Sequence, residues 1–406
     1  MHFVVYVTPW VSETAERALV AATRLRDVRV GLISQDPLSD FLPVIRNRVA
    51  VYRRIKSVNS SSELIGAIRS MVPAFGKVHR LVADSEETQV PLAETREMLN
   101  IDGMGLQEAV NFRDKFQMKQ LLTSAGICCP RYCLATSGLA AVRFANSVGY
   151  PLVVKPRAGV RSEHTFRVDD KNSLSAAVER VNAASMNGAL IEEYINGQEH
   201  SCESVVVQGE VLWQSITRYS PTPLEANREP GIPWCVLLPR NQNMARYGDI
   251  KATAKKVLNV LGMKNGIAHL EWFRRPDGSA VVSEAAARPP GAKIVELVSV
   301  AHESDFIKTW VELMVLGKYA PLPQRRFAAG AVFLRGRGSG RVQRVRGARS
   351  TLRELRSLVV EKQIPWAGQK SSTDYEGNGY IIVRHPTTRV VEQAMLKIGE
   401  TVKIVN

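Results

Sequence analysis

The sequence predicts an α/β domain at the N-terminus, an α+β region after it, and a small strand-rich lobe at the C-terminus. The 406 residues are too many for one ordinary hydrophobic core, so several domains are expected. Strand and helix patterns alternate up to about residue 105, which is typical of a small parallel sheet. Further along, strand pairs joined by tight turns, at 201–218 and 266–291, lie among helices, which is typical of an α+β region.

The N-terminal pattern predicts strands at residues 3–7, 28–33 and 78–82, with helices at 12–25 and 88–98. No glycine-rich G-x-G-x-x-G motif follows the first strand, so a dinucleotide site is not expected there. We interpret this domain as a scaffold that contributes part of a substrate pocket at its strand ends.

The stretch 266–291 predicts a β-hairpin with strands at 267–273 and 280–283. Asp277 and Gly278 are expected at the centre of the turn, because an Asp-Gly step supplies the positive φ that a two-residue turn requires.

This turn places Glu271 directly opposite Glu284. Like charges that face each other on a sheet are destabilising unless a cation lies between them. A Mg²⁺ ion bound by these carboxylates and by phosphate oxygens would remove that penalty. The alternative is a solvated hairpin with two surface glutamates.

Basic side chains indicate an anion site upstream of the hairpin. Lys155 ends an apolar strand, where a partly buried ammonium needs an anionic partner. The loop 157–164 that follows is basic and offers backbone donors, which suits phosphate, although it contains one glycine. Lys115 begins a helix that ends near Gly126. The proline-rich segment 219–243 is expected to be an irregular lid or a substrate loop.

A second acidic group follows the strand at 189–191. Glu192 and Glu193 come directly after it, and Glu199 follows a glycine turn. By themselves these residues are equally typical of a strand end with exposed carboxylates.

In their order along the chain, these segments resemble the ATP-grasp superfamily, closely from Asn111 to Lys318. The resemblance implies an ATP-grasp fold in which two α+β subdomains hold ATP. It also implies activation of a carboxylate as an acyl phosphate, attack by an amine, and release of ADP and phosphate. The expected domains are a pre-ATP-grasp domain, the small and large ATP-grasp subdomains and a C-terminal lobe, at 1–110, 111–195, 196–326 and 327–406.

The resemblance assigns phosphate and metal roles to five residues. Lys115 and Lys155 resemble the two lysines that contact the ATP phosphates, and Ser162 resembles a donor of the phosphate loop. Glu271 and Glu284 resemble the carboxylates that bind Mg²⁺, with Mn²⁺ as the alternative ion.

The resemblance also implies an adenine site after residue 191. Glu192 would lie beside the adenine amino group, and the backbone of Glu193 and Ile195 would pair with the adenine edge. Glu199 matches the acid that holds the ribose hydroxyls.

Arg288 resembles the arginine that stabilises the acyl phosphate and the tetrahedral intermediate, and His269 occupies a position facing the substrate pocket. Two departures stand out. Ala286 replaces the usual asparagine ligand, and His164 stands where a glycine is common. The motif Glu-x-x-x-Arg-Pro-x-Gly is most similar to bacterial L-amino acid ligases of the bacilysin-synthetase type and to carnosine synthase.

The chain carries a formal net charge of +15, which fits either nucleic acid or anionic small substrates. From residue 330 onward, 14 Lys and Arg stand against 6 Asp and Glu. No aromatic residue lies among the arginines at 335, 337, 341, 344, 346 and 349, so a solvated basic face competes with a binding patch. No apolar run reaches the roughly 18 residues of a membrane span, and the first ten residues lack the features of a signal peptide. The five cysteines lack metal spacing and are expected to be reduced thiols, consistent with the cytoplasm.

The sequence thus predicts a ligase that joins a small-molecule carboxylate to an amine, with an amino acid among its substrates and a homodimer as a compatible assembly. Formate- or biotin-type carboxyl activation is the second enzyme hypothesis. The third hypothesis is a non-catalytic nucleotide- or nucleic-acid-binding module, with nucleic acid the less favoured partner.

Overall fold

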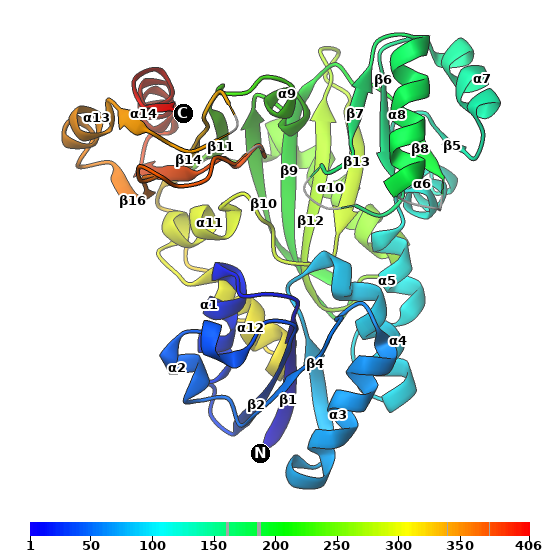
Figure 1. Ribbon diagram of the computed structural model, residues 1–406, viewed down its shortest axis with the longest axis vertical. Helices are drawn as coiled ribbons and strands as arrows, with labels where there is room; N and C mark the ends of the chain where they lie inside the picture. Colours follow the sequence, from blue (N-terminus) through cyan, green and yellow to red (C-terminus); the bar gives the residue numbers. More distant parts are fainter. Residues whose placement is uncertain (160–161, 185–187, 339, 373) are drawn as a thin grey trace.

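The computed structural model describes residues 1–159, 162–184, 188–338, 340–372 and 374–406. Its parts form an N-terminal α/β domain, a small α+β subdomain, and a large sheet that lies between them and extends into the C-terminal lobe (Figure 1). No described helix is long and apolar enough to cross a membrane. The five cysteines are free thiols.

The N-terminal domain is built on a parallel four-stranded sheet of order β3-β2-β1-β4. Apolar residues dominate its central strands, which are buried as expected of a sheet covered on both faces. The strands are β1 His2–Thr8, β2 Val28–Ser34, β3 Val51–Arg54 and β4 Val78–Val82. The helices are α1 Glu13–Ala22, α2 Pro43–Arg46, α3 Ser61–Phe75 and α4 Gln89–Leu99, and the short 3₁₀ helices are η1 Leu38–Asp40 and η2 Glu86–Thr88. The predicted parallel sheet is confirmed.

The small subdomain follows two helices and contains an antiparallel sheet of order β5-β8-β6-β7. Two of its helices pack together on one face of the sheet through a shared apolar cluster (Figure 1). The strands are β5 Tyr132–Ala135, β6 Leu152–Pro156, β7 Phe166–Val168 and β8 Ala189–Glu193. The helices are α5 Leu106–Arg113, α6 Lys115–Ser124, α7 Gly138–Val148 and α8 Lys171–Ala184.

An antiparallel eight-stranded sheet of order β13-β12-β9-β10-β11-β14-β17-β16 forms the centre of the molecule. Apolar residues of helix α10 cover one face, and helices α11 and α12 pack on the other face together with α1. The strands are β9 Gln198–Val207, β10 Glu210–Ser220, β11 Trp234–Leu238, β12 Gly266–Arg274, β13 Ala280–Ala286, β14 Ala328–Leu334, β16 Val359–Gln363 and β17 Gly379–His385. The helices are α10 Met244–Leu261, α11 Ile294–His302 and α12 Phe306–Leu316.

The C-terminal residues complete this sheet through β14, β16 and β17, so one sheet continues across residue 327. Helix α14 Thr388–Thr401 covers that part of the sheet through a separate apolar cluster. A two-stranded ribbon of β15 Arg344–Arg346 and β18 Lys403–Val405 lies beside helix α13 Ala348–Glu354. Arg344 and Arg346 are exposed on the ribbon.

The irregular conformation expected at 219–243 is wrong, because this segment contains helix α9 Pro223–Arg228 and strand β11, although Thr222, Pro223 and Leu224 do line a cavity. Strand β11 pairs with β10 on one side and with β14 on the other, inside the large sheet. Four of its five residues, Trp234, Val236, Leu237 and Leu238, are buried, as expected of a strand inside a covered sheet. A strand bonded on both sides cannot open as a lid.

The turn of the hairpin also differs from the prediction. Gly278 donates its backbone N–H to the Arg275 carbonyl, so Pro276 and Asp277 are the central turn residues and Gly278 follows them with φ of 86°. A register shift between Glu271 and Trp272 compensates for the longer turn.

Candidate active site

One cavity of about 450 Å³ lies between the N-terminal domain, the small subdomain and the large sheet. All eleven residues predicted to form the site line it: Lys115, Lys155, Ser162, Glu192, Glu193, Ile195, Glu199, His269, Glu271, Glu284 and Arg288. They come from elements that are distant in the sequence. The fold therefore brings the predicted residues to one place, while their individual roles stay predictions.

The two hairpin carboxylates face each other as expected. Glu271 on β12 is the register partner of Glu284 on β13, because the bulge restores the pairing that the longer turn displaces. Their side chains are 23% and 30% exposed, so both reach the cavity without being free in solvent. The surface-hairpin alternative is wrong for this pair.

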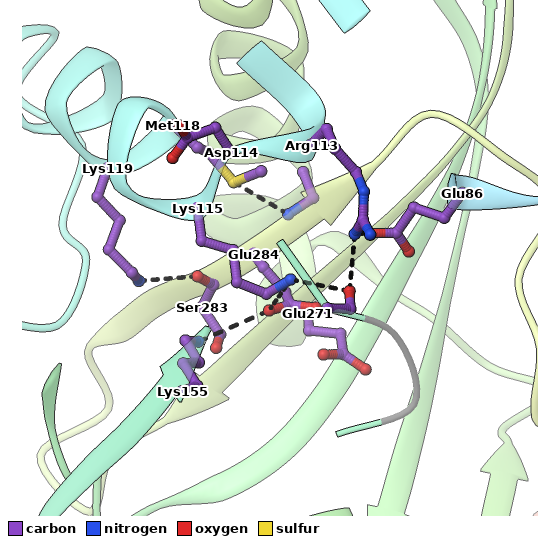
Figure 2. A network of polar contacts seen from close by, with 12 residues as sticks. Glu86, Arg113, Asp114, Lys115, Met118, Lys119, Lys155, Glu271, Ser283 and Glu284 are labelled. Atoms are coloured by element: carbon purple, nitrogen blue, oxygen red, sulfur yellow. Dashed lines mark hydrogen bonds and ion pairs between the residues drawn. The ribbon is translucent and has the colours of Figure 1, made fainter. Parts of the chain in front are cut away.

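Two lysines approach the Glu284 carboxylate from the small subdomain, as Figure 2 shows. The Nζ atoms of Lys115 and Lys155 each lie 3.6 Å from Glu284 Oε2. Burial acts to raise the pKa of Glu284, but these lysines lower it to about 2. Lys115 also donates to the Gly159 carbonyl at 3.3 Å, in the part of the phosphate loop that the structure describes.

Glu192 has a different environment from the one expected. Its Oε1 atom lies 3.1 Å from Nζ of both Lys119 and Lys155, and the side chain is almost completely buried. The prediction placed Glu192 beside the adenine amino group, whereas its carboxylate faces the two lysines. Lys119 also donates to the Ser283 carbonyl at 2.9 Å (Figure 2).

The segment after β8 joins the small subdomain to the large sheet. Glu193 accepts from Arg131 at 2.5 Å on one oxygen and from Arg275 of the hairpin turn at 2.8 Å on the other. Among the described residues, none accepts a hydrogen bond from the backbone N–H of Ile195. That donor is suited to an acceptor on the edge of a purine.

Glu199 on β9 is buried among the other carboxylates. Burial, together with Glu271 and Glu284, raises its pKa well above the usual value, while Lys155 lowers it. Ser162 and His164 have positive φ angles of 56° and 53°, so the glycine-poor loop adopts the left-handed conformation with ordinary residues. Residues 160 and 161 of the predicted phosphate loop lie outside the described residues.

His269 lies between two carboxylates. Its Nδ1 atom is 3.0 Å from Glu203 Oε1, and its Nε2 atom is 3.5 Å from Glu271 Oε1. Burial lowers the pKa of His269, but hydrogen bonds to both carboxylates outweigh it and raise the pKa to about 9. At neutral pH, His269 therefore carries a positive charge next to Glu271. Ala286 is the register partner of His269 and also lines the cavity.

Arg288 is fixed by the N-terminal domain. Its Nε and Nη2 atoms lie 3.0 Å from Oε2 of Glu86, and Arg113 donates to the other oxygen of Glu86 at 3.0 Å. Figure 2 shows Glu86 and Arg113 beside the two lysines and Glu284. This single buried carboxylate links η2, α5 and the segment after β13.

Lys119, Glu203 and Glu86 were not identified from the sequence, although the position of each in its helix, strand or loop could have indicated it. Lys119 is one helical turn after Lys115 and therefore on the same face of α6. Glu203 continues the alternation of Glu199 and Ser201 on the cavity face of β9. Glu86 follows the carboxyl end of a parallel strand, where ligand-binding residues of α/β domains gather.

Glu271 and Glu284 fit a magnesium ion whose other ligands are phosphate oxygens and water. Among the described residues, no cluster of three or more His, Cys, Asp or Glu forms a closed metal site. Glu271 and Glu284 offer two carboxylates on an open cavity wall, which is what Mg²⁺ uses when phosphate oxygens and water complete its shell.

Comparison with known proteins agrees with this geometry. Residues 148–296 match the model of the ATP-grasp domain. The L-arginine-specific L-amino acid ligase of Bacillus subtilis is 25% identical over 228 residues, which is 55% of this chain and 54% of that ligase.

Two solved structures share the fold. The L-amino acid ligase from Bacillus licheniformis superposes with a TM-score of 0.77 at 20% identity, covering 100% of this chain and 98% of that one. The biotin carboxylase domain of the Hydrogenobacter thermophilus 2-oxoglutarate carboxylase, solved as a dimer with MgADP and bicarbonate, gives 0.69 at 15% identity, with coverages of 99% and 90%. Residues 148–296 therefore match the ATP-grasp domain, and the whole chain shares its fold with these two enzymes.

Proposed function

We propose that this protein is an ATP- and Mg²⁺-dependent ligase that activates a carboxylate and joins it to an amine, with an amino acid as a substrate. The observation that carries the proposal is the convergence of Lys115, Lys155, Glu271 and Glu284 on one cavity wall. Phosphoryl transfer needs cations and metals placed around the phosphate oxygens more than covalent help from the protein.

Each group of residues has a defined task under this proposal. Lys115 and Lys155 bind phosphate oxygens, and the hinge at Glu193 and Ile195 binds the base through its backbone. When bound, Mg²⁺ on Glu271 and Glu284 neutralises phosphate charge and favours attack on phosphorus.

The cavity also offers groups that suit a zwitterion. Arg288 and Lys293 line it together with Glu86 and Glu296, so both signs of charge are available. Arg288 is oriented by Glu86 and can bind the negative charge that develops on a substrate carboxylate. An amino acid, which carries one charge of each sign, fits this arrangement. The match to an L-arginine-specific L-amino acid ligase supports the same substrate class.

The test is nucleotide turnover over pairs of L-amino acids and amines, with product mass determined by mass spectrometry. We expect ADP and phosphate with a condensed product that has lost one water. Release of AMP contradicts the acyl-phosphate route. A bicarbonate-dependent gain in mass, without condensation, would instead support carboxyl activation of the kind known for the biotin carboxylase neighbour.

The variant Glu284→Gln tests whether the charge of this carboxylate is needed for turnover. It keeps the size of the side chain but removes the charge that would hold Mg²⁺ and position both lysines, so turnover should fall at least about 100-fold. Glu210→Gln, at an exposed residue of the β9–β10 turn, is the control and should retain wild-type turnover. Equal turnover of Glu284→Gln and wild type would refute the metal assignment.

A further inference from the structure

Lys119 is a completely buried cation that does not belong to the wall of the cavity. Its side chain has no exposed surface, whereas Lys115 and Lys155 line the cavity. Its Nζ atom contacts Glu192 Oε1 at 3.1 Å and the Ser283 carbonyl at 2.9 Å, as Figure 2 shows for the latter. An ammonium in such a position is costly unless a carboxylate compensates it.

Glu192 shares its Oε1 atom between two lysines that differ in their access to the cavity. Lys155, at 3.1 Å, also reaches Glu284 and borders the cavity, so it can turn toward an anion there. If Lys119 were absent, that movement would leave Glu192 buried without a cation. Removing one partner of a buried pair is strongly unfavourable, so Lys155 would then be held on Glu192.

Lys119 cannot make the same movement. It is enclosed between β8 and β13, and its second hydrogen bond is to the backbone of Ser283, the residue before Glu284. The lysine therefore connects α6, which also carries Lys115, to the strand that carries a predicted metal ligand. Its charge stays with Glu192 whatever occupies the cavity.

We propose that Lys119 is a positioning residue: it is the fixed counter-charge of Glu192 and thereby leaves Lys155 free to bind phosphate. The inference rests on the proposed function, because it assumes that the cavity receives a nucleotide phosphate. It adds a residue that does not touch the nucleotide but sets how strongly Lys155 can bind it.

The test compares three variants by equilibrium binding of ATP and of adenosine, measured by calorimetry without added metal. Lys119→Met should weaken ATP at least about tenfold and adenosine less than about threefold, since only the phosphates need Lys155. The double variant Lys119→Met with Glu192→Gln removes both buried charges and should bring ATP affinity back to within about threefold of wild type. Lys256→Met on the exposed side of α10 is the control and should bind as wild type does.

Each outcome decides a different question. Wild-type protein that binds no ATP, either without metal or with Mg²⁺ added, refutes the proposed function and this inference with it. Wild-type ATP affinity in Lys119→Met, or equal losses for ATP and adenosine, refutes the inference alone. If the single variant does not fold, the double variant decides: it must fold and bind ATP as predicted, and failure in either respect overturns the assignment.

Discussion

Glu86→Gln tests how the N-terminal domain controls the site. In the wild type, one oxygen of Glu86 lies 3.0 Å from two nitrogens of Arg288, and the other accepts from Arg113 at 3.0 Å. Glutamine has nearly the same size, but it replaces one accepting oxygen by an amide NH₂ that cannot accept from a guanidinium. The variant therefore removes the charge and one of the two arginine contacts.

The expected loss of unfolding free energy follows from burial. The side chain of Glu86 is 9% exposed, against 17% for Arg113 and 22% for Arg288. Breaking a buried ion pair costs about 3–5 kcal/mol, and the partial exposure of both arginines lowers our expectation to about 2–3 kcal/mol. Turnover should fall as well, because Arg288 loses the contact that orients it.

The loss should depend on pH in a defined direction. Burial acts to raise the pKa of Glu86, but Arg288, Lys115 and Arg113 outweigh it and lower the pKa below its usual value. A carboxylate with a lowered pKa in the folded state stabilises the protein above its unfolded-state pKa of about 4.3, and this stabilisation disappears as pH falls through the lower, folded-state value. The difference between wild type and variant should be largest near pH 7 and should shrink below about pH 4.

Urea unfolding between pH 7 and about pH 3 measures this difference, with Glu179→Gln on the exposed face of α8 as the control. A Glu86→Gln protein as stable as the control at pH 7 would refute the reasoning. So would a difference that grows as the pH falls.

Two further predictions concern single substitutions near the site. Gly197→Ala places a Cβ 2.6 Å from the Arg274 carbonyl oxygen, so the substitution should lower the unfolding free energy by about 1–3 kcal/mol. Gly138→Ala is the control and should not lower it, because the added Cβ meets nothing within 4 Å. Equal thermal stability of the two variants would contradict this prediction. Ala286→Asn introduces an amide oxygen beside His269 on the cavity wall. The substitution should lower the Mg²⁺ concentration that half-saturates ATP turnover, because the amide adds an oxygen ligand. An unchanged or higher concentration would show that the amide does not reach the metal.

Local sequence determined much of this molecule. Alternating strand and helix patterns predicted the parallel sheet of the N-terminal domain. The spacing of apolar residues within a short segment shows which of its side chains are buried and therefore whether it forms a strand or a helix. Glu271 opposite Glu284 was also predicted correctly although the turn was not, because a register shift between Glu271 and Trp272 offsets the longer turn. Lys155 was also expected to meet an anion, because it ends an apolar strand. The specific roles of the other site residues came from the resemblance to a family, and all of them line the same cavity.

Other features were decided by tertiary structure. The prolines around β11 indicated an irregular lid, but hydrogen bonds from β10 and β14 and the burial of Trp234 make it an internal strand. The partners of Glu192 and Arg288 could not be predicted, because Lys119 and Glu86 reach them from other elements of the fold. A buried charge needs a partner within a few ångströms, and only the folded chain determines which charge that is.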